Sequence, residues 1–485
     1  MTDQWAGPRA HPGIVTAVIL LVGALTASSV AVSGGAASQS KSVALKQLTV
    51  VRDSGVSGAV LASRTLFDSA PTVVAFGAGA SGADVGRARN LAAENHVPMF
   101  EVGDDVTAVK DELTRLHTTG VLAVGDVPDL GVPVSDDDPT PAVASGAAGQ
   151  DALVLVAGGP DALATAESSG ASVVGLPVGD PRASGEAVAA LKEHPERPVL
   201  AIGAFGDEKT VATQIDAART VTELPGGGQL MFPGRRIVAL YGAPGTADLG
   251  PLGAQDVDAS IRRVKRAARL YDSISDAPVV PAFEIIATVA SAAPGDGGNY
   301  TNMTDPAALR PWIDAAEKAG VYVTLDLQPG RMDFLKQAKK YRDLLRRPHV
   351  GLALDPEWRL KPDQQHLTQI GSVDPAEVNR TADWLAALVH RDNLPQKAFV
   401  LHQFDAAMLG DRKLLDTSHP ELATVIHADG HGTPPVKMQT WRRIVRGLPP
   451  NVWLGWKNFY TEDSPTFSPR RTLRVNPEPW FISYQ

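Results

Sequence analysis

The sequence contains no cysteine in 485 residues, which excludes disulfide bonds, zinc–thiolate sites, iron–sulfur clusters and cysteine nucleophiles. An excess of basic residues is also missing, because 45 Lys and Arg stand against 54 Asp and Glu and the net charge is −9. A chain with this balance is not expected to bind nucleic acid as its main partner. The HExxH motif of helical zinc hydrolases is absent as well. The length predicts more than one domain, and we expect no cofactor.

Charged side chains are missing from one run near the N-terminus, residues 13–32. A run of about twenty uncharged residues is long enough to cross a bilayer. Residues 1–12 would then be a cytoplasmic n-region, residues 13–32 a cleaved signal peptide or an uncleaved transmembrane anchor, and residues 33–49 a linker. Both interpretations predict that the rest of the chain works outside the cytoplasm, either secreted or held in the membrane by a single span.

Residues 50–230 are rich in Ala, Gly and Val and alternate short apolar strands with helices. The pattern strand–helix–strand–helix–strand occurs twice, on either side of an acidic Pro/Gly linker, PVSDDDPTPAVASGAAGQ. Two such copies indicate an internal repeat of about eighty residues. Alternation of this kind predicts parallel sheets with helices outside them.

Each copy contains an Asp-led helix, such as VTAVKDELTRL, and a closing apolar strand, such as VLAVG. In these features the region resembles the cell-wall-binding repeats of secreted Gram-positive proteins, over about 150 residues. The resemblance implies that a cell-wall polymer is a partner of residues 50–230.

The composition changes at Pro233, after which Trp, His, Arg and Tyr become frequent. Eight apolar runs typical of buried strands follow, in residues 236–242, 278–288, 321–327, 350–355, 397–404, 421–429, 451–459 and 480–485. Helical patterns separate most of them, in residues 256–274, 305–320, 331–347, 374–392 and 434–448. Some helices begin with Asp-Pro, in which Asp caps the helix and Pro fits its first turn. Residues 233–485 are therefore predicted to form a TIM-like (β/α)₈ barrel, and the whole chain an α/β protein.

In such a barrel the active site lies where the strands end. Titratable, polar or aromatic side chains follow nearly every predicted strand, namely Tyr241, Glu284, Asp326, Arg331, Asp355, Glu357, Trp358, His402, Gln403, His427, Asp429, Trp456, Lys457 and Tyr460. So many strands ending in this way favour a functional pocket over capping alone.

Asp355 and Glu357 follow the fourth strand and are two residues apart, so on a strand they would point to the same side. Two neighbouring carboxylates can push each other's pKa values apart, which is what acid and base catalysis of glycoside cleavage requires. In the alternative interpretation, Asp355 caps the next turn and Glu357 forms a salt bridge with Arg331 or Arg359. Glu284 and Asp326 are the candidates for a second catalytic carboxylate.

The segment LALDPEW resembles the end of the fourth strand in chitinase-like and lysozyme-like barrel glycosidases, where an Asp-x-Glu motif stands. The resemblance implies that Glu357 donates the proton and that Asp355 assists it. Ala353 replaces a further Asp of the chitinase pattern, and Lys457 follows the seventh strand, where the two-carboxylate clan has its nucleophile. The detailed mechanism is therefore not carried over. The segments YGAPG, FEIIATVASA, LDPEWRL and WKNFY also resemble a family of secreted actinobacterial barrel proteins, which implies no activity.

We predict a glycoside hydrolase that acts on a cell-envelope or extracellular polysaccharide. The aromatic rings of Trp358, Trp456, Tyr460 and Tyr241 would stack on sugar faces. The remaining substrate contacts would come from His402, Gln403, His427, Asp429, Lys457 and Arg331.

Two other functions remain open from the sequence. A metal-dependent hydrolase of amides, esters or phosphodiesters could draw its ligands from His402, His427, Asp326, Asp355, Asp429 and Glu284. The spacing of these residues matches no known metal motif, and YGAPG stands where an HxH pair would follow the first strand. A non-catalytic glycan-binding barrel would keep the aromatic residues but would not need so many carboxylates.

Overall fold

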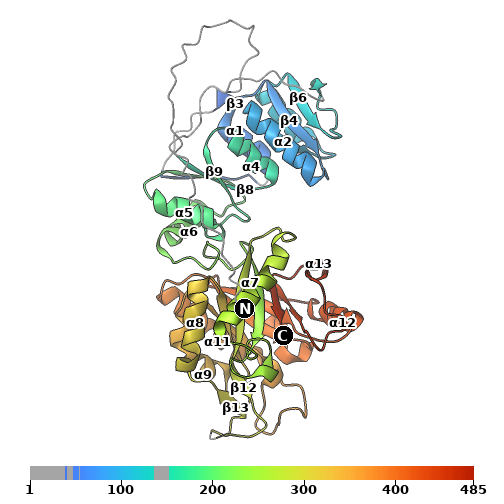
Figure 1. The fold of residues 1–485 in the computed structure, drawn as a ribbon. Coiled ribbons are helices and arrows are strands. Elements are labelled where there is room, and N and C mark those ends of the chain that lie inside the picture. Colours follow the sequence, from blue (N-terminus) through green and yellow to red (C-terminus); the bar gives the residue numbers. More distant parts are fainter. Residues whose placement is uncertain (1–38, 41–46, 54, 136–151, 296) are drawn as a thin grey trace, which may run out of the picture. The chain divides into compact units, whose positions relative to one another are not determined.

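The computed structural model describes residues 39–40, 47–53, 55–135, 152–295 and 297–485 (Figure 1). The predicted n-region and the predicted signal peptide or anchor, residues 1–32, lie outside this part of the chain, as does most of the predicted linker. Within the described ranges, no helix is both long enough and apolar enough to span a membrane.

Two four-stranded parallel sheets form the region before the barrel. The first has the order β5-β4-β6-β7 and contains β4 (Thr72–Gly77), β5 (Met99–Val102), β6 (Gly120–Val124) and β7 (Val134–Ser135). The second has the order β2-β10-β8-β9 and contains β2 (Leu48–Val51), β8 (Leu153–Ala157), β9 (Ser172–Gly175) and β10 (Val199–Gly203). A short antiparallel pair joins β1 (Gln39–Ser40) to β3 (Phe67–Ser69). Strand β2 begins two residues before the predicted boundary at residue 50.

The two sheets repeat one connection pattern. The helices are α1 (Gly58–Leu66), α2 (Gly82–Asn95), α3 (Thr107–Arg115), α4 (Pro160–Ser168), η1 (Pro181–Ala183), α5 (Gly185–Glu193) and α6 (Glu208–Thr220). In β4-α2-β5-α3-β6 and again in β8-α4-β9-α5-β10, the third strand pairs with the free side of the first. The predicted tandem of parallel α/β units is confirmed.

Eight parallel strands close a barrel in the second half of the chain. They are β11 (Arg236–Gly242), β12 (Val279–Ala290), β14 (Tyr322–Leu327), β15 (Val350–Leu354), β16 (Lys397–Gln403), β17 (Leu422–Ala428), β18 (Trp453–Asn458) and β19 (Phe481–Tyr484). Each strand pairs with the next, and β11 closes the ring by pairing with β19. Strand β13 (Thr301–Met303) adds an antiparallel extension to β12. The predicted TIM-like barrel is confirmed, and each predicted strand overlaps an observed one.

Helices pack around the outside of the strands (Figure 1). They are α7 (Val257–Asp272), α8 (Pro306–Ala319), α9 (Phe334–Ala338), α10 (Arg342–Leu345), α11 (Pro375–Arg391), α12 (Pro434–Ile444) and α13 (Pro469–Leu473). Asp305 and Asp374 cap α8 and α11 by accepting a hydrogen bond from a backbone N–H two residues on, as their Asp-Pro starts predict. Short 3₁₀ turns complete the fold: η2 (Ala247–Leu249), η3 (Lys339–Tyr341), η4 (Pro356–Trp358), η5 (Ala406–Leu409) and η6 (Arg412–Leu414).

Apolar side chains fill the N-terminal end of the barrel interior, and polar side chains fill its C-terminal end. The apolar set includes Ala239, Ala282, Ala353, Val400, Val425 and Phe481. Because side chains alternate between the two faces of a strand, the residue two positions further along points the same way. Those residues are Tyr241, Glu284, Asp355, His402, His427 and Ser483, all of them buried. The strands therefore direct a layer of polar groups toward the end of the barrel where active sites of this fold lie.

Candidate functional site

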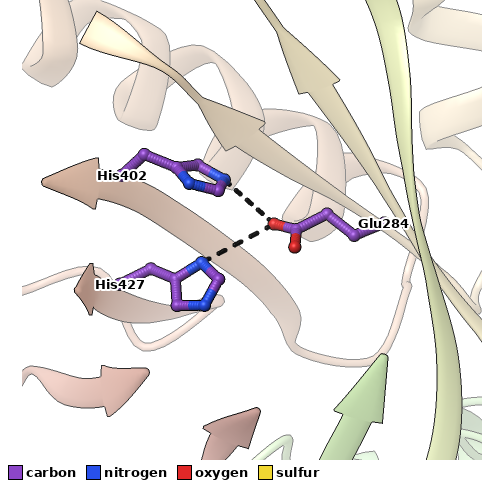
Figure 2. Close-up of side chains that lie close together, drawn as sticks. All are labelled: Glu284, His402 and His427. Atoms are coloured by element: carbon purple, nitrogen blue, oxygen red, sulfur yellow. Dashed lines mark hydrogen bonds and ion pairs between the residues drawn. The ribbon is translucent and has the colours of Figure 1, made fainter. Parts of the chain in front are cut away.

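Three buried side chains meet in the polar layer: Glu284 from β12, His402 from β16 and His427 from β17 (Figure 2). Glu284 Oε1 lies 3.0 Å from His402 Nε2 and 3.8 Å from His427 Nδ1. All three side chains are 0% exposed, and we call them the buried triad. Barrel closure brings them together, because Glu284 and His402 are 118 residues apart in the sequence.

Each histidine of the buried triad has a further partner on its other ring nitrogen. His402 Nδ1 lies 3.0 Å from Asp429 Oδ2, and His427 Nε2 lies 3.2 Å from Ser483 Oγ. Burial alone would lower the pKa of His402, but the carboxylates of Glu284 and Asp429 raise it well above its usual value. Burial lowers the pKa of His427 to about 3. In the metal-free protein, His402 is therefore a cation hydrogen-bonded to both carboxylates.

Asp326 lies beside the buried triad and is covered by Tyr241. Its Oδ1 atom is 3.9 Å from His402 Nε2, and its Oδ2 atom accepts a 2.7 Å hydrogen bond from the Tyr241 hydroxyl. Burial raises the pKa of Asp326 to about 6. Lys457 Nζ lies 3.6 Å from the centroid of the Tyr241 ring, a cation–π contact that holds the lysine above the tyrosine.

A cavity of about 390 Å³ opens at the C-terminal ends of the barrel strands, and we call it the mouth cavity. Its charged lining consists of Asp355, Glu357, Asp429 and Lys457. Its aromatic lining consists of Tyr241, Trp358, Phe404, His431 and Phe459. Carboxylates placed among flat rings suit a ligand that has both hydroxyl groups and apolar faces.

Glu357 projects into the mouth cavity without a partner for its carboxylate. Among the described residues, none donates a hydrogen bond to this group and none forms an ion pair with it. Arg359 instead pairs with Glu377 at 3.0 Å, and Arg331 stacks on Tyr300 at 4.3 Å. Burial, together with the charge of Asp429, raises the pKa of Glu357 from 4.5 to about 7. The carboxyl group therefore carries a proton over much of the range below neutral pH.

Asp355 forms the cap that its position in DPEW predicts, and it also lines the mouth cavity. Its Oδ1 atom accepts a 3.3 Å hydrogen bond from the backbone N–H of Glu357. Burial raises the pKa of Asp355 well above its usual value. The capping role thus fixes the backbone from which Glu357 projects, so the structural and functional interpretations of this pair are compatible.

Replacing Glu357 with Gln should stabilise the fold at alkaline pH. The contribution of Glu357 to wild-type stability is fully present below pH 4.5 and is lost as the pH rises through about 7, because ionising the folded carboxyl is unfavourable. A pKa shift of this size corresponds to a change of about 3 kcal/mol in the free energy of unfolding. Partial contact of the carboxyl with solvent reduces this value to about 1–3 kcal/mol. Urea unfolding at about pH 4 should show equal stabilities, and at about pH 8 the variant should be more stable. Equal stabilities at both values would mean that the pKa of Glu357 is ordinary.

Six residues predicted to contact substrate do not line the mouth cavity, and two of them are the polar-layer residues His402 and His427. Gln403 accepts a hydrogen bond from Arg412 on the outer side of β16. Trp456 packs against Trp441 at 5.4 Å between ring centroids. Arg331 donates a hydrogen bond to the backbone oxygen of Gln364, and Tyr460 stacks on Tyr484 at 5.5 Å. Glu284, Asp326, His402 and His427 lie in the polar layer and do not themselves line the cavity.

Ser483 is a site residue that the sequence reasoning missed. It follows Phe481 by two positions on β19, so the alternation of that strand could have placed it in the interior beside His427. Phe404 and Phe459 were missed as well. Each follows the last residue of its strand directly and becomes part of the wall of the mouth cavity.

Comparisons of this chain with protein-family models, with curated proteins and with solved structures find no match, so the function has to be inferred from the site itself.

Proposed function

We propose that the barrel is a glycoside hydrolase of cell-envelope or extracellular polysaccharide, with Glu357 as the proton donor. The observation that carries this proposal is the unpartnered carboxyl group of Glu357 in the mouth cavity, within the influence of a second carboxylate, Asp429. A carboxylic acid in this state can protonate the oxygen of a glycosidic bond as that bond breaks.

Asp429 suits the role of second carboxylate better than Glu284 or Asp326. Both of those side chains are 0% exposed, whereas Asp429 lines the mouth cavity. Its Oδ2 atom lies 3.0 Å from His402 Nδ1 and 3.9 Å from Lys457 Nζ, and these contacts fix its orientation. An anion held there can stabilise the positive charge that develops on the sugar ring or can activate water.

The reaction would then proceed with the following transfers. Glu357 gives its proton to the glycosidic oxygen, the carbon–oxygen bond breaks, and the leaving sugar departs as an alcohol. Water adds to the anomeric carbon and loses a proton, which restores the acid. Asp355 holds the Glu357 backbone through its capping hydrogen bond and supports the position of the acid.

The aromatic lining supports a sugar substrate over a small charged metabolite. Trp358 is adjacent to the proposed acid, and its ring packs edge-on against His366 at 5.4 Å. This contact limits the motion of the indole while leaving the residue in the cavity wall. Rings held in this way offer flat surfaces to the apolar faces of sugars.

An extracytoplasmic location and binding of residues 50–230 to a cell-wall polymer remain part of the proposal. The tandem of parallel α/β units supports the second point, since it is the arrangement that the resemblance to wall-binding repeats implies.

Incubation of the full-length protein with purified envelope polysaccharides tests the proposed function. New reducing ends, with fragments identified by mass spectrometry, are the expected result. Retention on the polysaccharide without release of fragments would instead favour a glycan-binding barrel. Hydrolysis that survives Glu357→Gln but is abolished by EDTA would favour a metal-dependent hydrolase.

A further inference from the structure

The buried triad has the composition of a metal site. One carboxylate oxygen of Glu284 and one ring nitrogen of each of His402 and His427 all lie within 4.8 Å of one another. Asp326 Oδ1 lies 3.9 Å from the same His402 nitrogen. Two imidazoles and one carboxylate are a ligand set that zinc and similar divalent ions accept.

Several polar atoms of this cluster lack the partners that buried polar atoms normally have. Among the described residues, no group forms a hydrogen bond with Glu284 Oε2, Asp326 Oδ1 or His427 Nδ1. The side chains that carry these atoms are 0% exposed. Three unsatisfied atoms on neighbouring side chains in a closed interior point to a shared cationic partner.

The spacing of the ligand atoms fits a tetrahedral ion. Oxygen and nitrogen ligands at zinc–ligand distances of about 2.0–2.2 Å lie about 3.3 Å from each other. Glu284 Oε1 lies 3.0 Å from His402 Nε2 and 3.8 Å from His427 Nδ1, which are distances on either side of that separation.

The hydrogen bonds on the side of each imidazole that faces away from Glu284 determine which ring nitrogen can bind a metal. His402 can donate Nδ1–H to Asp429, and His427 can donate Nε2–H to Ser483, at 3.0 and 3.2 Å. With a metal ion bound, the other nitrogen of each ring would be deprotonated and would direct its lone pair to the ion. Carboxylate and hydroxyl partners of this kind orient metal-bound histidines in many proteins.

We propose that Glu284, His402 and His427 bind one zinc-class divalent ion beneath the mouth cavity. The inference goes beyond the proposed function, because it concerns residues below the cavity and holds whether or not Glu357 is an acid. Asp429 lines the cavity and contacts the ligand His402, so it links the proposed metal site to the mouth cavity.

Metal analysis of the full-length protein tests this site without an activity assay. After incubation with Zn²⁺ and removal of loosely bound ions, the wild type should retain about one ion per chain. Glu284→Gln and His427→Gln should each lower the retained zinc about tenfold or more. His419→Ala is the matched control, since His419 belongs to a second cluster with Asp383 and Asp416, which is open to solvent. This variant should retain zinc like the wild type.

Two measurements on the wild type keep the test decisive if a variant fails to fold. Removal of zinc by a chelator should lower Tm, and added zinc should restore it. Replacement by Co²⁺ should produce the visible absorption of a tetrahedral cobalt site. The proposal is overturned if the wild type retains less than about a tenth of an ion per chain and Tm does not respond to chelation. It is equally overturned if His419→Ala loses zinc as fully as His427→Gln.

Discussion

Glu357→Gln is expected to reduce the rate of polysaccharide hydrolysis by about 10²–10⁴-fold, the usual contribution of a general acid. The amide has the same shape as the carboxyl group but cannot give up a proton to the leaving oxygen. The fold should be preserved, because the Glu357 carboxylate forms no hydrogen bond or ion pair with any described residue. Release of reducing ends, measured at saturating substrate, gives kcat for each protein.

Glu462→Gln is the matched control for this substitution, because Glu462 also follows a barrel strand, β18, but is exposed and does not line the mouth cavity. Its rate should equal that of the wild type. The assignment of Glu357 fails if its variant keeps more than about a tenth of the wild-type rate, since a tenfold loss corresponds to only about 1.4 kcal/mol.

His402→Ala should lower the free energy of unfolding by about 3–5 kcal/mol, the cost of breaking a buried ion pair from one side. The imidazole ring lies 3.0 Å from Glu284 and 3.0 Å from Asp429, and its side chain is 0% exposed. Without it, Glu284 would lose its hydrogen-bonded cation, and Asp429 would keep only Lys457 at 3.9 Å. The free energy of unfolding should fall in the same way if a metal ion is bound, because the variant then loses His402 as a metal ligand.

Urea unfolding followed by circular dichroism measures this effect. His419→Ala serves as the comparison, because His419 forms a partly exposed pair with Asp383 and should contribute less than about 1 kcal/mol. A loss below about 1 kcal/mol for His402→Ala would contradict the view that the histidine holds the polar layer together.

The barrel could be predicted from the sequence because its strands are fully buried and its helices begin with clear capping residues. The runs 350–355 and 421–429 have no competing pattern, and Asp305 and Asp374 mark helix caps without ambiguity. The helix predicted for residues 331–347 is instead divided into α9, η3 and α10. Within it, the Tyr341 hydroxyl donates hydrogen bonds to the backbone oxygens of Ala287 and Thr304, which are tertiary contacts that helical periodicity does not contain.

Site residues can be predicted from the sequence where the alternation of side chains along a strand determines which of them point into the barrel. His402 and Lys457 face the interior and the mouth cavity, whereas their neighbours Gln403 and Trp456 face outward, because one step along a strand reverses the side. Both members of each neighbouring pair are predicted to contact substrate, although only one member of a pair can point inward. Arg331 and Tyr460 lie in loops beyond the strand ends, where alternation gives no direction.

The depth of each group in the barrel was not predictable in the same way. Glu284 and Asp326 lie within β12 and β14, whereas Asp355 directly follows β15, and the first two lie in the polar layer without lining the mouth cavity. Their height depends on the stagger between neighbouring strands, which the register pairs of the closed barrel determine and the sequence of a single strand does not. Asp429, two residues past His427, reaches the cavity for the same reason.

The dependence of rate on the leaving group tests the role of Glu357 most directly. The wild type and Glu357→Gln would be compared on the polysaccharide and on a dinitrophenyl glycoside of the same sugar, whose leaving group departs without protonation. If Glu357 is the proton donor, the variant loses about 10²–10⁴-fold on the polysaccharide but stays within about tenfold of the wild type in the rate of dinitrophenol release. An equal loss on both substrates would contradict the proposed role, because it would show that Glu357 acts on something other than the leaving oxygen.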